Sequence, residues 1–259
     1  MPNNTDKIFH VRKLPITNNG ARYFIRGFDL ITHKSLRKFV FIPLAINILL
    51  FSLALYFMIE EIGHYMDMLV NWLPSWLDWL NIVIWPVAVA TILILFSFVF
   101  SSAANWLAAP FNGLLCEKVE ALLSDDLPPQ GGPLDIIKDI PRTLGREFKK
   151  LSYYLPRAIG FFLIMWILPL IGQVIWFLFV TWMMAIQYKD YPFDNHKISF
   201  TDMISIIKQK QGLSYSFGAT VAVFSMIPII NFIVMPVAIC GATAMWVDHY
   251  KANFVTRTY

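Results

Sequence analysis

The feature that most constrains this chain is an apolar run at residues 39–59, FVFIPLAINILLFSLALYFMI, which contains no Asp, Glu, Lys, Arg or His. A helix rises about 1.5 Å per residue, so a run of this length covers the roughly 30 Å hydrocarbon core of a bilayer. Lys34, Arg37 and Lys38 precede it, and Glu60 and Glu61 follow it. The run therefore predicts a transmembrane helix.

Composition supports a membrane protein. The chain is 57% hydrophobic and 15% charged, whereas a soluble domain carries about 25% charged residues. Its net charge of +4 is too small to indicate a nucleic-acid partner. The two cysteines, Cys116 and Cys240, lie in apolar runs and are predicted to be small buried residues.

Four apolar stretches divide the chain, at residues 39–59, 82–111, 159–188 and 219–247. The first two are typical of spanning helices, and the second is expected to continue as one helix through Leu122. Residues 1–19 are a polar N-terminal tail. We expect a single membrane domain over residues 1–259 with an all-α fold.

The last two stretches each contain a proline-centred break, ILPLIG at residues 167–172 and MIPIIN at residues 226–231. Proline removes a backbone donor, and Gly or Asn shortly afterwards readily turns a chain. Each half then holds about 12 to 16 residues, roughly 18 to 24 Å, which falls short of a crossing. The pattern fits two re-entrant helical hairpins or two full spans kinked at proline.

Charges in the connecting segments favour the hairpins. Of the 21 Lys and Arg residues, most precede residue 39 or lie in residues 112–158, and residues 60–81 contain none. The positive-inside rule places the former two segments in the cytoplasm and residues 60–81 outside. Two hairpins keep residues 189–211, with four lysines, on the cytoplasmic side.

Two connecting segments are predicted to be amphipathic helices at an anionic surface or against a neighbouring helix. Residues 141–155 place four apolar side chains on one face and four cations largely on the other, and residues 20–31 repeat the pattern. The residues concerned are Leu144, Phe148, Leu151 and Leu155 with Arg142, Arg146, Lys149 and Lys150, and Phe24, Phe28 and Ile31 with Arg22 and Arg26.

The segment Lys34-Ser35-Leu36-Arg37-Lys38 is the candidate binding site. A helix N-terminus leaves backbone N–H groups unpaired and carries partial positive charge. With a guanidinium and an ammonium added, it suits a tetrahedral oxyanion. The simpler alternative is that Arg37 and Lys38 only anchor the helix to lipid phosphates.

Other polar residues offer less. Enzyme motifs are missing, so we expect no enzyme, cofactor or metal. Asn105 is one of the neutral polar groups in the apolar stretches, and Glu117 and Glu120 are the carboxylates nearest the membrane if protons take part. Their alternative is an exposed helix extension. Asp190, Asp194 and His196 favour a tight polar turn around Pro192 over a metal cluster.

The residues from about Gly20 to Val247 resemble the bacterial CysZ sulfate permeases, which are related to the etoposide-induced membrane protein family. The resemblance rests on the order and spacing of several phrases: GARYF at 20–24 with Gly27, LRKF at 36–39 with Pro43 and Asn47, APFN at 109–112, EKVE at 117–120, DYPFDNH at 190–196, PIIN at 228–231, PVA at 236–238 and GAT at 241–243.

This resemblance implies a sulfate uptake protein of the bacterial inner membrane that supplies cysteine synthesis. The sequence leaves open whether sulfate moves as through a channel or together with protons. It also implies two long spanning helices, two partly penetrating hairpins and a homo-oligomer in the lipid bilayer. A Gly-Leu-Arg-Arg-like phrase is associated with sulfate binding in that family. Here it reads Ser35-Leu36-Arg37-Lys38, so Arg37 carries over, Lys38 keeps the charge, and Ser35 replaces glycine.

A different class of function stays open beside sulfate transport. Partly inserted hairpins and surface helices wedge into one leaflet, so the chain could be a non-transporting, membrane-shaping scaffold. A lipid enzyme is disfavoured because no nucleophile, metal cluster or buried carboxylate pair is evident.

Overall fold

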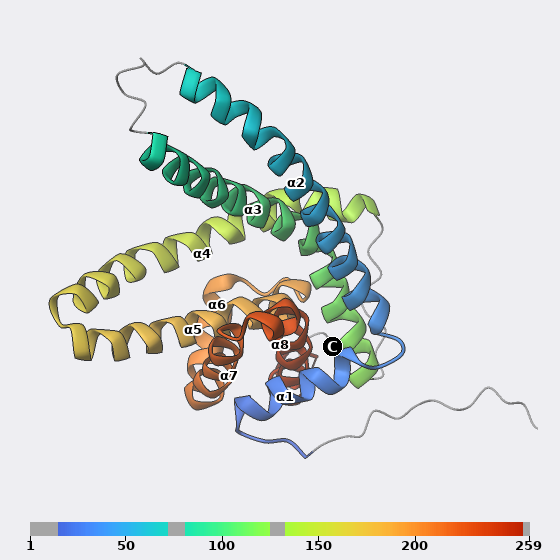
Figure 1. Ribbon diagram of the computed structural model, residues 1–259. Helices are drawn as coiled ribbons and strands as arrows, with labels where there is room; N and C mark the ends of the chain where they lie inside the picture. Colours follow the sequence, from blue (N-terminus) through green and yellow to red (C-terminus); the bar gives the residue numbers. More distant parts are fainter. Residues whose placement is uncertain (1–14, 72–80, 125–132, 256–259) are drawn as a thin grey trace, which may run out of the picture. The chain divides into compact units, whose positions relative to one another are not determined.

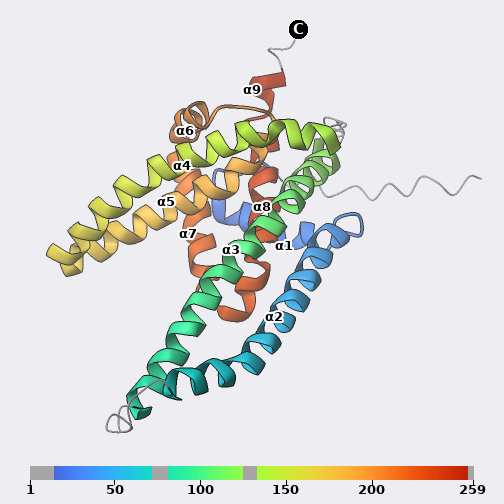
Figure 2. The same ribbon diagram turned by 90° about the horizontal axis from the view of Figure 1, so that it is seen from above.

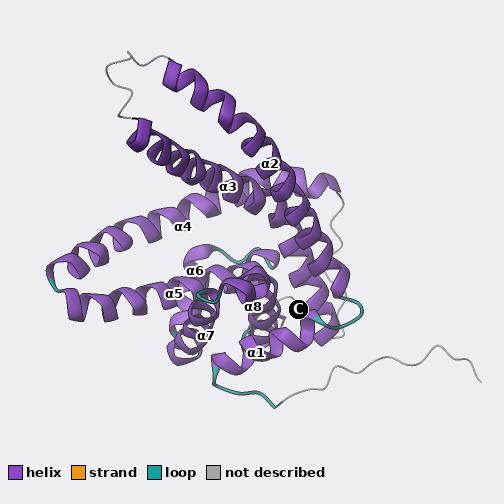
Figure 3. Ribbon diagram, viewed as in Figure 1, coloured by secondary structure: helices purple, strands orange, loops and turns teal. Residues whose placement is uncertain are grey.

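The computed structural model describes residues 15–71, 81–124 and 133–255, and every regular element in these ranges is a helix (Figure 1; Figure 3). An all-α membrane protein was predicted, and the fold class is confirmed. The chain forms two compact units, Phe39–Phe111 and a second that joins Met1–Lys38 to Asn112–Tyr259. Most of the predicted N-terminal tail, residues 1–14, lies outside the described residues.

The unit Phe39–Phe111 is built from most of α2 (Arg37–Asn71) and the first part of α3 (Asn81–Ser124). The ring centroid of Phe51 on α2 lies 5.9 Å from that of Phe96 and 4.9 Å from that of Phe100 on α3. Many other apolar side chains are exposed, as a lipid-facing surface requires. As predicted, the second apolar stretch continues as one helix past Leu122.

The core of the other unit is formed by α1 (Gly20–Ile31), α5 (Pro169–Asn195), α7 (Gln211–Ser225) and α8 (Pro228–His249). Glycines let these helices approach closely. A Cβ at Gly27 would overlap the Val237 carbonyl oxygen, and a Cβ at Gly218 would overlap the Thr181 carbonyl oxygen. Tightly packed, fully buried aromatic rings fill the space between the helices: Phe24, Phe193, Phe217 and Trp246.

Two helical hairpins belong to this unit. The helix α4 (Pro133–Ile167) pairs with α5, and the two run side by side in both views (Figure 1; Figure 2). The helices α7 and α8 form the second pair. The chain breaks at Leu168 and at Met226–Ile227, so both proline-centred breaks are confirmed. Two shorter helices, α6 (Phe200–Lys208) and α9 (Ala252–Val255), complete this unit.

The second half of each hairpin is longer than predicted. The helix α5 has 27 residues and α8 has 22, because each continues past its apolar stretch into charged sequence. Together with Arg37–His64, they are the three described helices long and apolar enough to cross a membrane. The turn predicted around Pro192 is also wrong, since α5 runs through Pro192 to Asn195.

Both amphipathic segments pack against neighbouring helices, which is one of the two predicted alternatives. On α1, Phe24 and Ile31 are buried against the protein and Arg26 pairs with Asp248 at 3.0 Å, so α1 is a core helix. On α4, the apolar residues Leu144 and Phe148 are exposed, as is Lys149, whereas Arg146 and Lys150 bind Asp190 on α5. The carboxylates that Arg26 and Arg146 bind are distant in the sequence, so local periodicity does not indicate them.

Candidate functional site

The predicted oxyanion site lies in the turn between α1 and the start of α2. The backbone N–H groups of Leu36 and Arg37 both donate to the His33 carbonyl oxygen, at 3.0 and 3.1 Å. Leu36 is completely buried, whereas Ser35, Arg37 and Lys38 are exposed. The leucine therefore anchors the turn, and its neighbours present their polar groups to the surroundings.

The Arg37 guanidinium is held by one contact. Its Nε donates to the Thr32 carbonyl oxygen at 2.8 Å. Within residues 15–71, 81–124 and 133–255, its two terminal nitrogens make no hydrogen bond, which leaves the fork that binds oxyanions in a bidentate manner available. Thr32 thus fixes the base of the guanidinium without occupying its binding edge.

His33 supports the same turn. Its Nδ1 lies 2.7 Å from Ser35 Oγ and 3.4 Å from the Ser35 backbone nitrogen. Because a backbone N–H only donates, Nδ1 accepts here, and the ring proton sits on Nε2. The sequence alone does not indicate this contact, since the spacing of one His and one Ser carries no signal of a hydrogen bond.

The electrostatics of this turn suit a doubly negative solute. Lys34, Arg37 and Lys38 are exposed together, at the N-terminus of a 35-residue helix that carries partial positive charge. Exposed cations attract anions over roughly 8 Å at physiological ionic strength. The turn can therefore gather and orient an oxyanion, and it contains no group that would do covalent chemistry on it.

The other candidate residues lie elsewhere. Glu120 is mostly buried, 2.8 Å from His196 Nε2 and 3.0 Å from Lys251 Nζ, with the Trp246 indole nitrogen at 3.3 Å. Among the described residues it makes no hydrogen bond or ion pair with Ser35–Lys38. Glu117 is half-buried. The side chain of Asn105 lies outside the described residues.

The surroundings of Glu117 and Glu120 shift the pKa values of these two carboxyl groups in opposite directions. Burial raises the pKa of Glu117 above its usual value, despite Lys118. Burial also acts to raise the pKa of Glu120, but the hydrogen bonds and positive charges of His196 and Lys251 outweigh it and lower that pKa. Glu120 is therefore an ionised partner of two basic groups, and its predicted alternative as an exposed helix extension is wrong.

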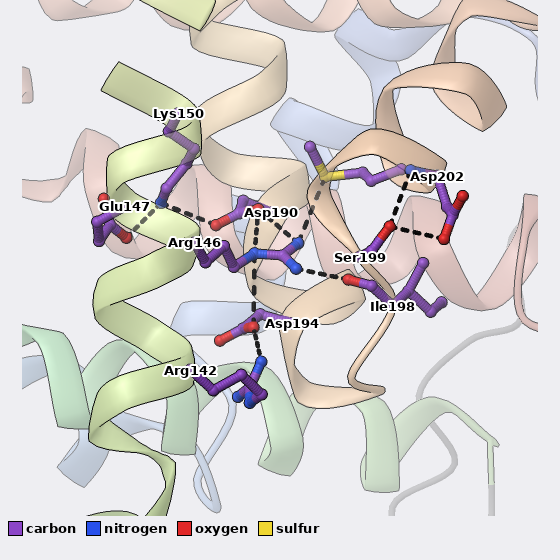
Figure 4. A network of polar contacts seen from close by, with 10 residues as sticks. Arg142, Arg146, Glu147, Lys150, Asp190, Asp194, Ile198, Ser199 and Asp202 are labelled. Carbon is purple, nitrogen blue, oxygen red and sulfur yellow. Dashed lines mark hydrogen bonds and ion pairs between the residues drawn. The ribbon is translucent and has the colours of Figure 1, made fainter. Parts of the chain in front are cut away.

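The strongest polar network joins α4 to α5 (Figure 4). Asp190 receives Arg146 Nη2 at 2.7 Å and Lys150 Nζ at 2.9 Å, and Arg142 binds Asp194. Burial acts to lower the pKa of Lys150, but Asp190 and Glu147 outweigh it and raise that pKa. These cations hold the hairpin together, so most of the predicted cationic face of residues 141–155 contacts a neighbouring helix, which is one of the two predicted alternatives.

A metal centre is not formed by the acidic and histidine residues near Pro192. Asp190 and Asp194 bind the cations of α4, and His196 binds Glu120. In the part of the chain that the structure describes, no group of three or more His, Cys, Asp or Glu side chains could hold a metal ion.

Comparison with known proteins agrees with the membrane fold. Residues 23–236 match the family model described as "Sulfate transporter CysZ/Etoposide-induced protein 2.4". A Vibrio atlanticus protein named "Sulfate transporter CysZ" is 52% identical over 91% of this chain and 95% of its own length. Proteins of the same name from Salmonella typhimurium and Pectobacterium atrosepticum are 46% and 45% identical, over 92% and 96% of this chain and 95% and 92% of their own lengths.

These names describe transporters and not enzymes. The matched region includes the turn before α2, the hairpin of α4 and α5, the phrase from Asp190 to His196, and the second hairpin as far as residue 236. The chain therefore belongs to the family of sulfate transporter CysZ and etoposide-induced protein 2.4.

Proposed function

We propose that this protein carries sulfate across the bacterial inner membrane as a multi-pass homo-oligomer, and so supplies sulfur for cysteine synthesis. The observation that carries the proposal is the 52% identity, over 91% of the chain, to a protein named as a sulfate transporter. The exposed cations at the start of α2 give that function a physical basis.

Sulfate is proposed to bind first at Ser35, Leu36, Arg37 and Lys38. Arg37 supplies the bidentate fork and Lys38 supplies a second charge. Leu36 holds the turn in place with its buried side chain, because its backbone N–H already donates to the His33 carbonyl oxygen. A charge-assisted hydrogen bond contributes about 1.5 to 3 kcal/mol, and exposure to water reduces this. The site is therefore suited to reversible capture, which passage across a membrane requires.

The hairpins are proposed to enter the bilayer without leaving it at their turns. Leu168 N donates to Ile164 O at 2.9 Å, and Met226 N and Ile227 N donate to carbonyl oxygens at 3.2 Å. The next residue in each turn is a proline, which has no N–H. Satisfied donors and exposed apolar side chains, such as Leu170 and Ile229, suit a turn surrounded by hydrocarbon.

Whether protons accompany sulfate is part of the same proposal. Glu117 and Glu120 are the carboxylates that would take part, and Asn105 would line the route. Glu120 already has two basic partners, so a proton reaching it must first weaken its pairing with His196 or Lys251.

The purified protein in sealed proteoliposomes, with labelled sulfate outside, tests this function. We expect saturable sulfate accumulation above that of protein-free vesicles. Faster uptake under an imposed inward proton gradient, at zero membrane potential, would show coupling. Background-level uptake in vesicles that the protein visibly remodels would support the membrane-shaping scaffold instead.

A further inference from the structure

A second cluster of basic side chains lies where α5, the start of α7 and the end of α8 meet. Lys189 on α5 is 1% exposed, and its Nζ lies 2.7 Å from Ser214 Oγ and 3.3 Å from the Tyr250 hydroxyl. Lys210, at the start of α7, is exposed. The two lysine Nζ atoms lie 5.4 and 5.5 Å from the centre of the Tyr250 ring.

Lys189 has no carboxylate partner among the described residues. Its neighbour Asp190 binds Arg146 and Lys150 on α4. Asp248, near the end of α8, binds Arg26 and Tyr23 on α1, both at 3.0 Å.

The hydroxyl partners of Lys189 are not negative either. Burial raises the pKa of Tyr250 to about 12, so its hydroxyl stays protonated near neutral pH. Ser214 Oγ lies 3.2 and 3.3 Å from the Lys210 and Ile207 carbonyl oxygens, to which it donates, so it accepts from Lys189. Burial without a counter-ion and repulsion from Lys210 both disfavour the charged form of Lys189, so an anion bound nearby would favour it.

His249 holds Lys210 in place without adding charge. Its Nε2 lies 2.9 Å from the Thr17 carbonyl oxygen and therefore carries a proton. Its Nδ1, 3.2 Å from Lys210 Nζ, can then only accept. The His249 carbonyl oxygen is a second acceptor at 3.3 Å. Lys210 is thus positioned at the surface beside the buried Lys189 even though the two like charges repel.

We propose that Lys189, Lys210 and Tyr250 form a second oxyanion site, for sulfate or for the phosphate of an acidic lipid headgroup. An anion bound by the exposed Lys210 ammonium would lie in the field of Lys189, which the protein interior screens weakly. The bound anion would be the counter-charge of Lys189, since the nearby Asp190 and Asp248 are paired with other cations. The site is distinct from the turn before α2 and does not depend on sulfate passage.

Sulfate binding to the full-length, detergent-purified R37A/K38A variant tests whether the second site binds free sulfate. We expect one saturable site to remain. Adding Lys189→Met and Lys210→Met should lower its affinity at least tenfold, whereas adding Lys118→Ala and Lys149→Ala, two exposed lysines on α3 and α4, should not. Lys210→Met alone changes only a surface cation and gives the answer if the buried substitution impairs folding.

Native mass spectrometry of the protein released from phosphatidylglycerol nanodiscs tests whether the second site binds the phosphate of a lipid headgroup. A lipid ligand predicts that K210M and K189M/K210M retain fewer phosphatidylglycerol molecules than the wild type, while K118A/K149A retains as many. It also predicts that phosphatidylglycerol displaces the remaining sulfate. If removing both lysines lowers neither the affinity for sulfate nor the number of phosphatidylglycerol molecules retained, the proposal is overturned. Because these are binding measurements, their failure is separable from failure of transport.

Discussion

At the scale of single residues, the structure depends on a few buried charges that are paired over long sequence distances. Glu120 is the clearest example, because His196 and Lys251 both lie within 3.0 Å of it. Removing one member of a buried ion cluster leaves the others uncompensated and costs roughly 3 to 5 kcal/mol. Glu120 is therefore a stabilising residue whatever part it has in transport.

We predict that Glu120→Gln lowers the free energy of unfolding by roughly 3 kcal/mol near neutral pH. Thermal unfolding in detergent, followed by circular dichroism, measures the change. Glu117→Gln is the matched control and should change stability by less than about 1 kcal/mol, since the half-buried Glu117 has no ion-pair partner within 4 Å among the described residues. Equal effects of the two substitutions would contradict the assignment.

The ion pairs of Glu120 also predict that the stability of the protein depends on pH. A carboxyl whose folded pKa is lowered stabilises the fold above its unfolded pKa, about 4.3, and this contribution is lost as pH falls through the folded value. The stability difference between the wild type and Glu120→Gln should therefore shrink as the pH is lowered below about 4. Melting temperatures of both proteins between pH 7 and pH 3 measure it, and a constant difference would refute it.

At the scale of helices, close glycine contacts set the distance between α5 and α7. Gly218→Ala should destabilise by about 1 to 3 kcal/mol, because its Cβ would overlap the Thr181 carbonyl oxygen. Gly160→Ala, in α4 with nothing within 4 Å, should stabilise by about 0.4 to 1 kcal/mol. Chemical unfolding of both variants compares them, and similar effects would contradict the packing.

The sequence predicts where the helices begin and end better than it predicts which side chains pair between them. Apolar length gives α2 and α3, and Pro169 and Pro228 give the two breaks, since both signals are local. The ion pairs of α1 and α4 are not predicted, because Asp248 and Asp190, which attract Arg26 and Arg146, are 222 and 44 residues away. In the candidate site, Arg37 and Lys38 are evident from charge, whereas the His33–Ser35 contact needs coordinates.

At the scale of the whole molecule, the proposed topology puts residues 189–211 on the cytoplasmic side. A cysteine replacing the exposed Lys208 should react with an impermeant maleimide only from the cytoplasmic face, and one replacing the exposed Glu61 only from the opposite face. Both natural cysteines are fully buried, so background labelling should be low. Labelling of both replacements from the same side would contradict the hairpins.

The most direct test of the account is initial sulfate uptake into proteoliposomes by Arg37→Ala/Lys38→Ala, compared with Lys149→Ala/Lys208→Ala. Each pair removes two exposed cations, so a nonspecific charge effect would be equal in both. We expect the first pair to raise the sulfate concentration for half-maximal uptake about tenfold or more, since about 1.4 kcal/mol of lost binding is a factor of ten. Wild-type uptake by the first pair would contradict sulfate capture at the start of α2.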